Sequence, residues 1–220
     1  MSKIIFTQYL PLNDQFEEYA DYIENKQRNY ALKYGATYAL HTPDDIDNYD
    51  DLQLNKILLA EKYAQQFDQV LYMDYDVIPT DHAPDIFRKV NGLSLYPTFP
   101  KVGMREYDKL LDKQMMLASE GRKYNNIIYN TGVFHCDKAS MEELKFSERF
   151  DECKELCSDF NNEVYISYII ERYGCKHNFL PMCWNYILDG FQEMPNAAGY
   201  FHHYHHKKFW CLLPDSNRDA

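Results

Sequence analysis

Two aspartates follow a continuous apolar run in the stretch Asp68-Gln69-Val70-Leu71-Tyr72-Met73-Asp74-Tyr75-Asp76-Val77. The four residues 70–73 form an unbroken apolar segment, which is typical of a strand buried on both faces of a parallel sheet. Ligands of parallel α/β sheets bind beyond the carboxyl ends of the strands. We therefore expect the carboxylates of Asp74 and Asp76 to enter a cleft at the edge of such a sheet.

Two carboxylates one residue apart at a strand end can hold a hard divalent cation. Such a cation would neutralise the phosphate oxygens of a bound ligand. The same triplet also fits a solvated turn, because Asp is common in turns. The return to apolar character at Val77 and Ile78, directly after the buried strand, favours the metal site.

The residues before this stretch alternate between strand and helix patterns, which predicts right-handed βαβ units and a mostly parallel sheet. Gly35 suits the position just past the end of a helix. The predicted order is a strand at 4–6, a helix from 13 or 14 to 34, a strand at 36–41 and a helix over about 54–64.

The second half of the chain has a less regular pattern. Short strands are expected at 93–96, 176–180, 184–188 and 199–204, and helices at 110–118, at about 140–157 and from 161 or 162. A further strand over 127–136 is interrupted by the polar triplet 130–132. With no repeat or low-complexity linker in the sequence, we expect one catalytic domain over residues 1–213 and a polar tail at 214–220.

The composition excludes several classes of protein. A hydrophobic fraction of 45% excludes an intrinsically disordered chain. Lys and Arg total 23 against 34 for Asp and Glu, a net charge of -11, so we expect no nucleic-acid partner. No apolar run approaches the roughly 18–20 residues of a membrane helix. The six cysteines form no C-x-x-C pair, and there is no signal-peptide core or glycosylation sequon, which favours a cytoplasmic protein.

A histidine- and lysine-rich tract runs from residue 202 to residue 210, and four of the eight histidines lie at 202–206. Neutral imidazole is a suitable third ligand for an ion such as Mn²⁺, and ammonium groups complement a diphosphate. The alternative is a basic surface tract that binds metal adventitiously.

Two further groups of polar residues are candidates for ligand contacts. In Asn130-Thr131-Gly132, glycine permits the close approach of a ligand or of backbone, and the asparagine offers a donor and an acceptor to hydroxyls. A structural bulge explains the triplet equally well. Asn162 and Glu163 lie at an expected helix start, where Glu163 is either a catalytic carboxylate or a compensation of the helix dipole.

In this order, the motifs resemble those of GT-A-fold glycosyltransferases, in particular the glycogenin-like and bacterial galactosyltransferase-like members of glycosyltransferase family 8. Residues 68–77 look like the signature "yDkvLylDxDvl" of that family, and residues 129–133 are similar to its "fNsGvml" strand. Residues 180–185 resemble its "Lp..wN", and residues 203–210 resemble its closing "HfxGxxKPW". The similarity extends over residues 3–210 and implies an α/β fold of the GT-A (Rossmann-like) type, with a mixed, mostly parallel sheet flanked by helices.

The resemblance implies a metal-dependent hexosyltransferase that uses a nucleoside-diphosphate sugar, with a UDP-hexose favoured as donor and a hydroxyl of a glycan or glycoconjugate as acceptor. Asp74, Asp76 and His203 would hold Mn²⁺ or Mg²⁺. The other donor-binding residues that it implies are Thr7, Gln8, Tyr9, Lys56, Tyr75, Gly132, Lys207 and Trp210, and the catalytic ones are Asn130, Asn162, Glu163 and Lys208.

Members of the family retain the anomeric configuration, which implies a retaining enzyme. Asn162 stands where they usually have Asp, so an inverting enzyme with Glu163 as base stays open. The chain is short for this fold, which is consistent with part of a longer multidomain protein. Two other classes also fit Asp-x-Asp after an apolar strand. They are a phosphatase of the haloacid-dehalogenase type and a non-catalytic carbohydrate-binding module.

Overall fold

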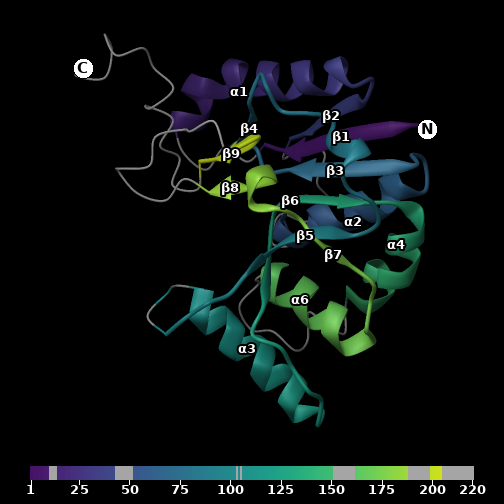
Figure 1. Cartoon of the computed structure of the whole chain (residues 1–220), viewed down its shortest axis with the longest axis vertical. Coiled ribbons are helices and arrows are strands. Elements are labelled where there is room, and N and C mark those ends of the chain that lie inside the picture. The colour runs from purple at the N-terminus through teal and green to yellow at the C-terminus, as the bar shows by residue number, and fades with distance from the viewer. Residues whose placement is uncertain are drawn as a thin grey trace.

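The computed structural model of the 220-residue chain describes residues 1–9, 14–42, 52–102, 104, 106–150, 162–187 and 199–204. A six-stranded sheet forms its centre, in the order β2-β1-β3-β6-β5-β7 (Figure 1). Its strands are β1 (Lys3–Gln8), β2 (Thr37–His41), β3 (Gln69–Met73), β5 (Ser94–Thr98), β6 (Ile128–Cys136) and β7 (Asn178–Phe179).

The pairs β1–β2, β1–β3 and β5–β7 are parallel, whereas β6 runs antiparallel to both β3 and β5. The expected α/β fold with a mixed, mostly parallel sheet is therefore confirmed. Phe6 lies opposite Tyr72 in the parallel pair, so the carboxyl ends of β1 and β3 meet at one edge of the sheet.

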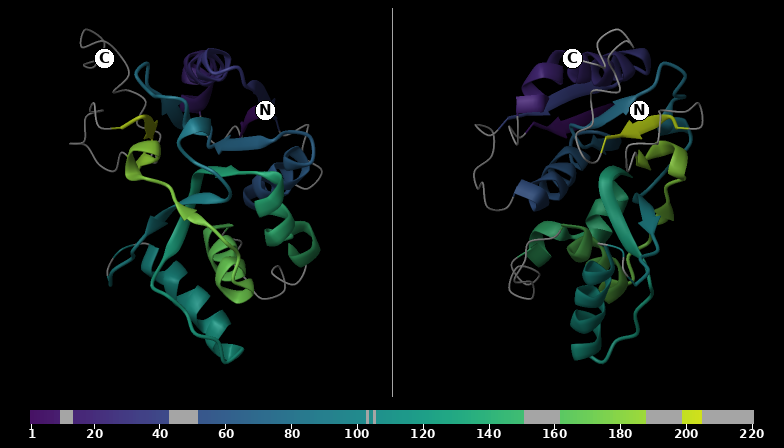
Figure 2. Two further views of the ribbon diagram at one scale, coloured as in Figure 1. Left: turned by 45° about the vertical axis from the view of Figure 1, so that its right-hand side comes forward. Right: turned by 90° about the vertical axis from the view of Figure 1, so that its left-hand side faces the viewer.

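Helices cover both faces of this sheet, as the two rotated views show (Figure 2). Ile5, Leu71 and Met73 point to the side of α1 (Asp14–Lys33), where they pack with Tyr30 and Ala31. The alternate residues of β1 and β3 pack on the other face against α2 (Leu52–Ala64), α4 (Lys138–Leu144) and α6 (Asn162–Tyr173). Every residue of β3 is buried, which confirms that this strand is covered on both sides.

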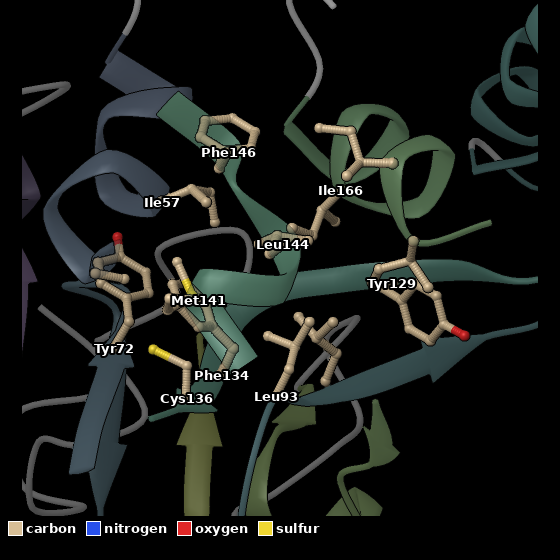
Figure 3. Close-up of a cluster of buried hydrophobic side chains, with 14 of the residues drawn as sticks. Ile57, Tyr72, Leu93, Tyr129, Phe134, Cys136, Met141, Leu144, Phe146 and Ile166 are labelled. Carbon is tan, nitrogen blue, oxygen red and sulfur yellow. The ribbon is translucent and has the colours of Figure 1, made fainter. Parts of the chain in front are cut away.

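The larger hydrophobic cluster lies on the α2–α4–α6 side of the sheet. Figure 3 shows Ile57, Tyr72, Phe134, Met141 and Ile166 converging there from five elements. Because a buried large side chain contributes about 2–5 kcal/mol against truncation to Ala, this cluster anchors β3 and β6 rigidly beside each other.

The polar triplet of β6 does not end the strand, which is continuous for nine residues. Its pairing with β5 is irregular, since Leu95 lies opposite Phe134 whereas Tyr96 lies opposite Asn130. Residues 131–133 therefore form a bulge on β6, the structural role that the triplet equally suggested.

A second, three-stranded sheet has the order β4-β9-β8, from β4 (Val77–Pro79), β8 (Tyr186–Ile187) and β9 (Phe201–His203). β4 pairs with β9 so that Val77 lies opposite His203, and the Tyr204 backbone amide donates to the Asp76 carbonyl at 2.9 Å. This pairing carries His203 to the two aspartates across more than 120 residues of sequence.

Several boundaries differ from the expectations. The helix expected over 140–157 is divided in the described residues, because α4 starts earlier and ends at Leu144 and helical backbone resumes over 146–150. Lys145 then adopts a left-handed conformation with φ 46°. This turn directs Phe146 into the larger cluster, where it is fully buried. Residues 151–157 lie outside the described residues.

The remaining differences are small. α3 (Glu106–Ser119) is longer than expected, and the expected strands at 176–180, 184–188 and 199–204 shrink to β7, β8 and β9. Trp184, the first residue of the strand expected at 184–188, belongs instead to a 3-10 turn over Met182–Trp184. None of the helices in the described parts of the chain combines the length and apolar character that crossing a membrane requires.

Candidate functional site

Asp74, Asp76 and His203 form one compact cluster, with one ligand atom from each lying within 4.8 Å of the other two. The Nε2 atom of His203 is 3.4 Å from Asp76 Oδ1 and 4.0 Å from Asp74 Oδ2. The side chains of Asp76 and His203 are 4% and 3% exposed, whereas that of Asp74 is 29% exposed. The cluster thus opens to solvent at Asp74, and the structure brings together the three residues predicted as metal ligands.

Backbone hydrogen bonds fix the turn that carries the two aspartates. The Asp74 amide donates to the Gly132 carbonyl at 2.7 Å, and the Val77 amide donates to the Asp74 carbonyl at 3.0 Å. On the α1 side, the buried amide of Gln27 donates to the carbonyls of Asp74 and Val77. Both carboxylates are therefore held on rigid backbone, as a preformed site requires.

The chemistry of the donor set fits a divalent cation. Carboxylates are the ligands that Mg²⁺ and Mn²⁺ prefer, and imidazole is a common ligand of first-row transition ions. Three ligands leave further coordination positions for water or ligand oxygens. One buried and one partly exposed carboxylate lie close together here, and a bound cation would offset the repulsion between their charges.

Lys56 reaches the first aspartate, as expected of a residue near the donor. Its buried Nζ lies 3.0 Å from Asp74 Oδ1 and 4.8 Å from the centre of the Tyr72 ring. The Tyr72 hydroxyl donates to the same Oδ1 at 2.6 Å. Burial and the adjacent Asp74 charge raise the pKa of Tyr72 well above its usual value, so this hydroxyl stays a donor.

Tyr72 was missed as a site residue because it looked like one more apolar position of β3. The signal was present, since side chains two residues apart on a strand share a face and Tyr72 precedes Asp74 by two. With Lys56 and Tyr72 both on Oδ1, Asp74 presents Oδ2 to the cluster.

Gly132, which the resemblance implied as a donor-binding residue, lies against the His203 ring. A Cβ atom added at this position would lie 2.4 Å from Cε1 and 2.8 Å from Nδ1 of His203. Real Cβ atoms do not approach other atoms so closely, so any larger residue would displace the imidazole. The close approach that glycine permits here is that of the His203 ring.

Asn130 joins the cluster to the start of α6. Its Oδ1 accepts from the Gly132 amide at 3.0 Å and from Asn185 Nδ2 at 2.7 Å, and its Nδ2 donates to Glu163 Oε1 at 2.7 Å. Asn185 Oδ1 in turn lies 2.9 Å from His203 Nδ1. The amide predicted to bind hydroxyls thus holds protein groups at both its oxygen and its nitrogen.

The start of α6 is fastened to β6 by both of its predicted site residues. Asn162 Nδ2 donates to Thr131 Oγ1 at 2.8 Å, and Glu163 accepts from Asn130 and from Lys109 of α3. Lys109 was missed by the sequence, because nothing in the polar stretch around it distinguishes this lysine from a solvated one.

The end of β1 carries polar side chains that are buried. Thr7 Oγ1 and Gln8 Nε2 have no hydrogen-bond partner among the residues that the structure describes. Buried polar atoms are normally paired, so a ligand is one source of such partners. The Tyr9 ring lies 4.8 Å from that of Tyr75, whose hydroxyl donates to Glu24 on α1. Tyr75 therefore points toward α1 and not toward the two aspartates.

Three predicted residues, Lys207, Lys208 and Trp210, lie outside the described residues. His203 is thus the described member of the closing motif that reaches the cluster.

No protein-family model matches the sequence, and no curated protein matches it. Solved structures do match. A glycosyltransferase involved in the glycosylation of the major capsid of PBCV-1 superposes over 100% of this chain and 97% of its own, with a TM-score of 0.61 and 14% identity. Mouse xyloside xylosyltransferase 1, in its apo form, superposes over 93% of this chain and 97% of its own, with a TM-score of 0.55 and 8% identity. The chain shares the fold of these glycosyltransferases.

Proposed function

We propose that this chain is a metal-dependent glycosyltransferase, similar to family 8, that moves a hexose from a nucleoside-diphosphate sugar to a hydroxyl of a glycan or other acceptor. The observation that carries the proposal is the Asp74–Asp76–His203 cluster at the carboxyl end of β3, in a fold shared with glycosyltransferases. Residues 1–213 would form the catalytic domain, and UDP is the favoured nucleotide.

Asp74, Asp76 and His203 would hold Mn²⁺ or Mg²⁺ in this reaction. When bound, the ion supplies positive charge that stabilises the departing nucleoside diphosphate. Lys56 stays beside Oδ1 of Asp74, so that Oδ2 of Asp74 remains directed at the cluster. Lys207 and Lys208 would add charge at the leaving phosphate, and Trp210 belongs to the same segment.

The base and ribose of the donor would lie at the end of β1. The buried Thr7 Oγ1 and Gln8 Nε2 support this placement, because a nucleotide offers the hydrogen-bond partners that they lack in the described chain. Tyr9, whose ring contacts that of Tyr75, would form the wall of that subsite.

We propose that transfer retains the anomeric configuration. An inverting reaction needs a carboxylate that accepts the proton of the acceptor hydroxyl. Both oxygens of Glu163 already accept hydrogen bonds from protein groups, Oε1 from Asn130 and Oε2 from Lys109, so the carboxylate serves to hold these residues together. Glu163 would instead stabilise positive charge that develops on the sugar, with Asn130 and Asn162 fixing its position.

A thermal-unfolding screen tests the binding part of this function. UDP, GDP and CMP are each added with and without Mn²⁺, beside metal-only and protein-only controls. A ligand at about 100 times its dissociation constant stabilises the folded state by roughly 2.7 kcal/mol, which is a measurable shift. The proposal predicts a shift that requires both UDP and the metal.

The outcomes separate the alternatives. A shift with GDP and metal would keep the transferase and change the donor. Metal-dependent release of phosphate from a phosphomonoester, without a nucleotide effect, would support a phosphatase. No nucleotide effect together with carbohydrate binding would indicate a binding module. Release of UDP from a UDP-hexose, increased by an acceptor glycan, then tests transfer itself.

A further inference from the structure

Asn185 lies behind His203 on the side away from the aspartates, and none of the roles discussed above includes it. It follows the 3-10 turn Met182–Trp184, precedes β8 and is fully buried. Its carboxamide contacts two polar side chains, Asn130 and His203. A buried amide in contact with a candidate metal ligand can control which ring nitrogen of that ligand carries the proton.

The orientation of the neighbouring Asn130 amide follows from groups that have only one hydrogen-bonding role. The Gly132 backbone N–H can only donate, and it points at Asn130 Oδ1. The Glu163 carboxylate, paired with Lys109, accepts from Asn130 Nδ2. Both contacts require the same orientation, with Oδ1 toward Asn185 and Nδ2 toward Glu163.

The orientation of Asn185 then follows in the same way. Because Asn130 presents an acceptor, Asn185 must present its Nδ2 there, at 2.7 Å. Its Oδ1 is consequently the atom that faces His203 Nδ1, at 2.9 Å. A carboxamide oxygen can only accept, so the neutral ring carries its proton on Nδ1 and its lone pair on Nε2, the atom nearest Asp74 and Asp76.

We propose that Asn185 is a positioning residue that fixes His203 in the Nδ1–H tautomer and so prepares Nε2 as a metal ligand. The other tautomer would set the ring lone pair against the Asn185 oxygen in a site without water access, since His203 and Asn185 are both buried. Gly132 contributes to this arrangement in two ways. Its backbone N–H orients the Asn130 amide, and its lack of a side chain leaves room for the His203 ring. The inference rests on the proposed metal site but not on the transfer reaction.

Three variants test the role of Asn185. Asn185→Leu removes the acceptor at similar size. Asn185→Asp retains an acceptor for Nδ1–H, as carboxylates do behind many metal-binding histidines, but it loses the donor to Asn130 Oδ1. Gln69→Leu is the matched control, because Gln69 is another buried carboxamide, with its Nε2 on the Phe87 carbonyl and no contact with the cluster. Circular dichroism and thermal unfolding verify that each variant folds.

The first readout is the tautomer itself, from long-range ¹H–¹⁵N correlations of the His203 ring in the metal-free protein at a pH where the ring is neutral. We expect Nδ1–H in the wild type, in Asn185→Asp and in Gln69→Leu, and a loss of this preference in Asn185→Leu. An Nε2–H ring in the wild type would overturn the proposal, whatever the protein catalyses.

The second readout is the affinity for Mn²⁺ alone. Removal of the group that orients a metal-binding histidine lowers affinity by about 10–100-fold. We expect such a loss for Asn185→Leu, a smaller loss for Asn185→Asp and none for Gln69→Leu. Equal affinity of Asn185→Leu and wild type would overturn the positioning role and leave the proposed function standing. A wild type that binds no Mn²⁺ would overturn both, and equal losses in Asn185→Leu and Gln69→Leu would indicate a structural effect only.

Discussion

The carboxyl end of β3 and the bulge of β6 are both short polar segments on buried strands, and they lie side by side in the sheet. At the end of β3, Asp74 and Asp76 turn their carboxylates toward a third ligand and toward solvent. In the bulge and directly before it, Gly132 and Asn130 instead face protein groups, namely His203, Glu163 and Asn185.

The difference indicates a division of labour between ligand contact and support. A residue that coordinates a bound ion must stay open to that ion on one side. A residue that orients a coordinating side chain is instead enclosed by that side chain and by neighbouring protein groups. Substitution of the aspartates that follow β3 should therefore abolish metal binding. Changes at the bulge should weaken binding or turnover by smaller factors.

The largest effect is expected for Asp76→Ala. This carboxylate is nearly buried and lies 3.4 Å from His203 Nε2, so its loss removes a ligand and one negative charge. Affinity for UDP with Mn²⁺ should fall by more than about 100-fold, since even loss of a supporting group lowers metal affinity by about 10–100-fold. Calorimetric titration measures this, and circular dichroism checks the fold. Full-strength binding by the folded variant would exclude Asp76 as a ligand.

Glu163→Gln should separate binding from turnover. The glutamine can still accept from Asn130, so nucleotide and metal binding should stay close to wild type. Loss of the charge near the reacting sugar should lower kcat by about 100-fold, the effect typical of one electrostatic group. Steady-state kinetics with a UDP-hexose, beside the binding titration, gives both values. An unchanged kcat would remove Glu163 from the reaction.

The sequence predicted the two aspartates and the alternation of β1, α1, β2, α2 and β3, because each of these patterns is local. It also singled out His203, Glu163 and Asn130, which donates to Glu163, but not Lys109 or Asn185. Tyr72 shares a strand face with Asp74, two residues away, whereas Lys109 and Asn185 act through contacts between residues that lie 54 and 18 positions apart. Such partners depend on the folded arrangement of β6, β9 and α6, which periodicity does not encode.

The neighbour of Gly132 could not be predicted either, because it too depends on a tertiary contact. Its residue type suggested a close approach, but only the β4–β9 pairing brings the His203 ring there. The break at Lys145, within the helix expected over 140–157, was missed for a related reason. The left-handed Lys145 serves the burial of Phe146, a tertiary contact, and a lysine carries no local signal for that conformation.

Gly132→Ala should have an intermediate effect, because the new Cβ would displace the His203 ring. We expect a loss of about 1–3 kcal/mol in unfolding free energy. Mn²⁺ affinity should also fall by about 10–100-fold. Gly121→Ala is the matched control. At φ +68° with no neighbour within 4 Å, it should cost about 1–2 kcal/mol in strain without altering metal affinity. Equal metal affinities in the two variants would contradict the role of Gly132.

The smallest expected effect is a loss of folding stability at alkaline pH, which follows from buried tyrosines. Burial raises the pKa of Tyr129 on β6 to about 12. On the α1 side of the sheet, burial raises the pKa values of Tyr30 and Tyr38 further still. These groups ionise in the unfolded chain near pH 10, before they ionise in the folded one, so their contribution is complete below pH 10 and is lost as the pH rises above it.

Denaturant unfolding at pH 8–11, with tyrosinate absorbance followed in parallel, measures this decline. Burial lowers the pKa of Lys113, whose contribution rises with pH below 10.5 and opposes the tyrosines in part. Tyr129→Phe should make the decline shallower. Stability that stays level from pH 9 to 11 would show that these hydroxyls are not buried as described.

The most direct measurement of the central claim is the anomalous scattering of manganese in crystals grown with UDP and Mn²⁺. We expect one strong peak between the carboxylates of Asp74 and Asp76 and the Nε2 atom of His203, in contact with the diphosphate. A bound UDP with no manganese among these three side chains would contradict the metal site and the function built on it.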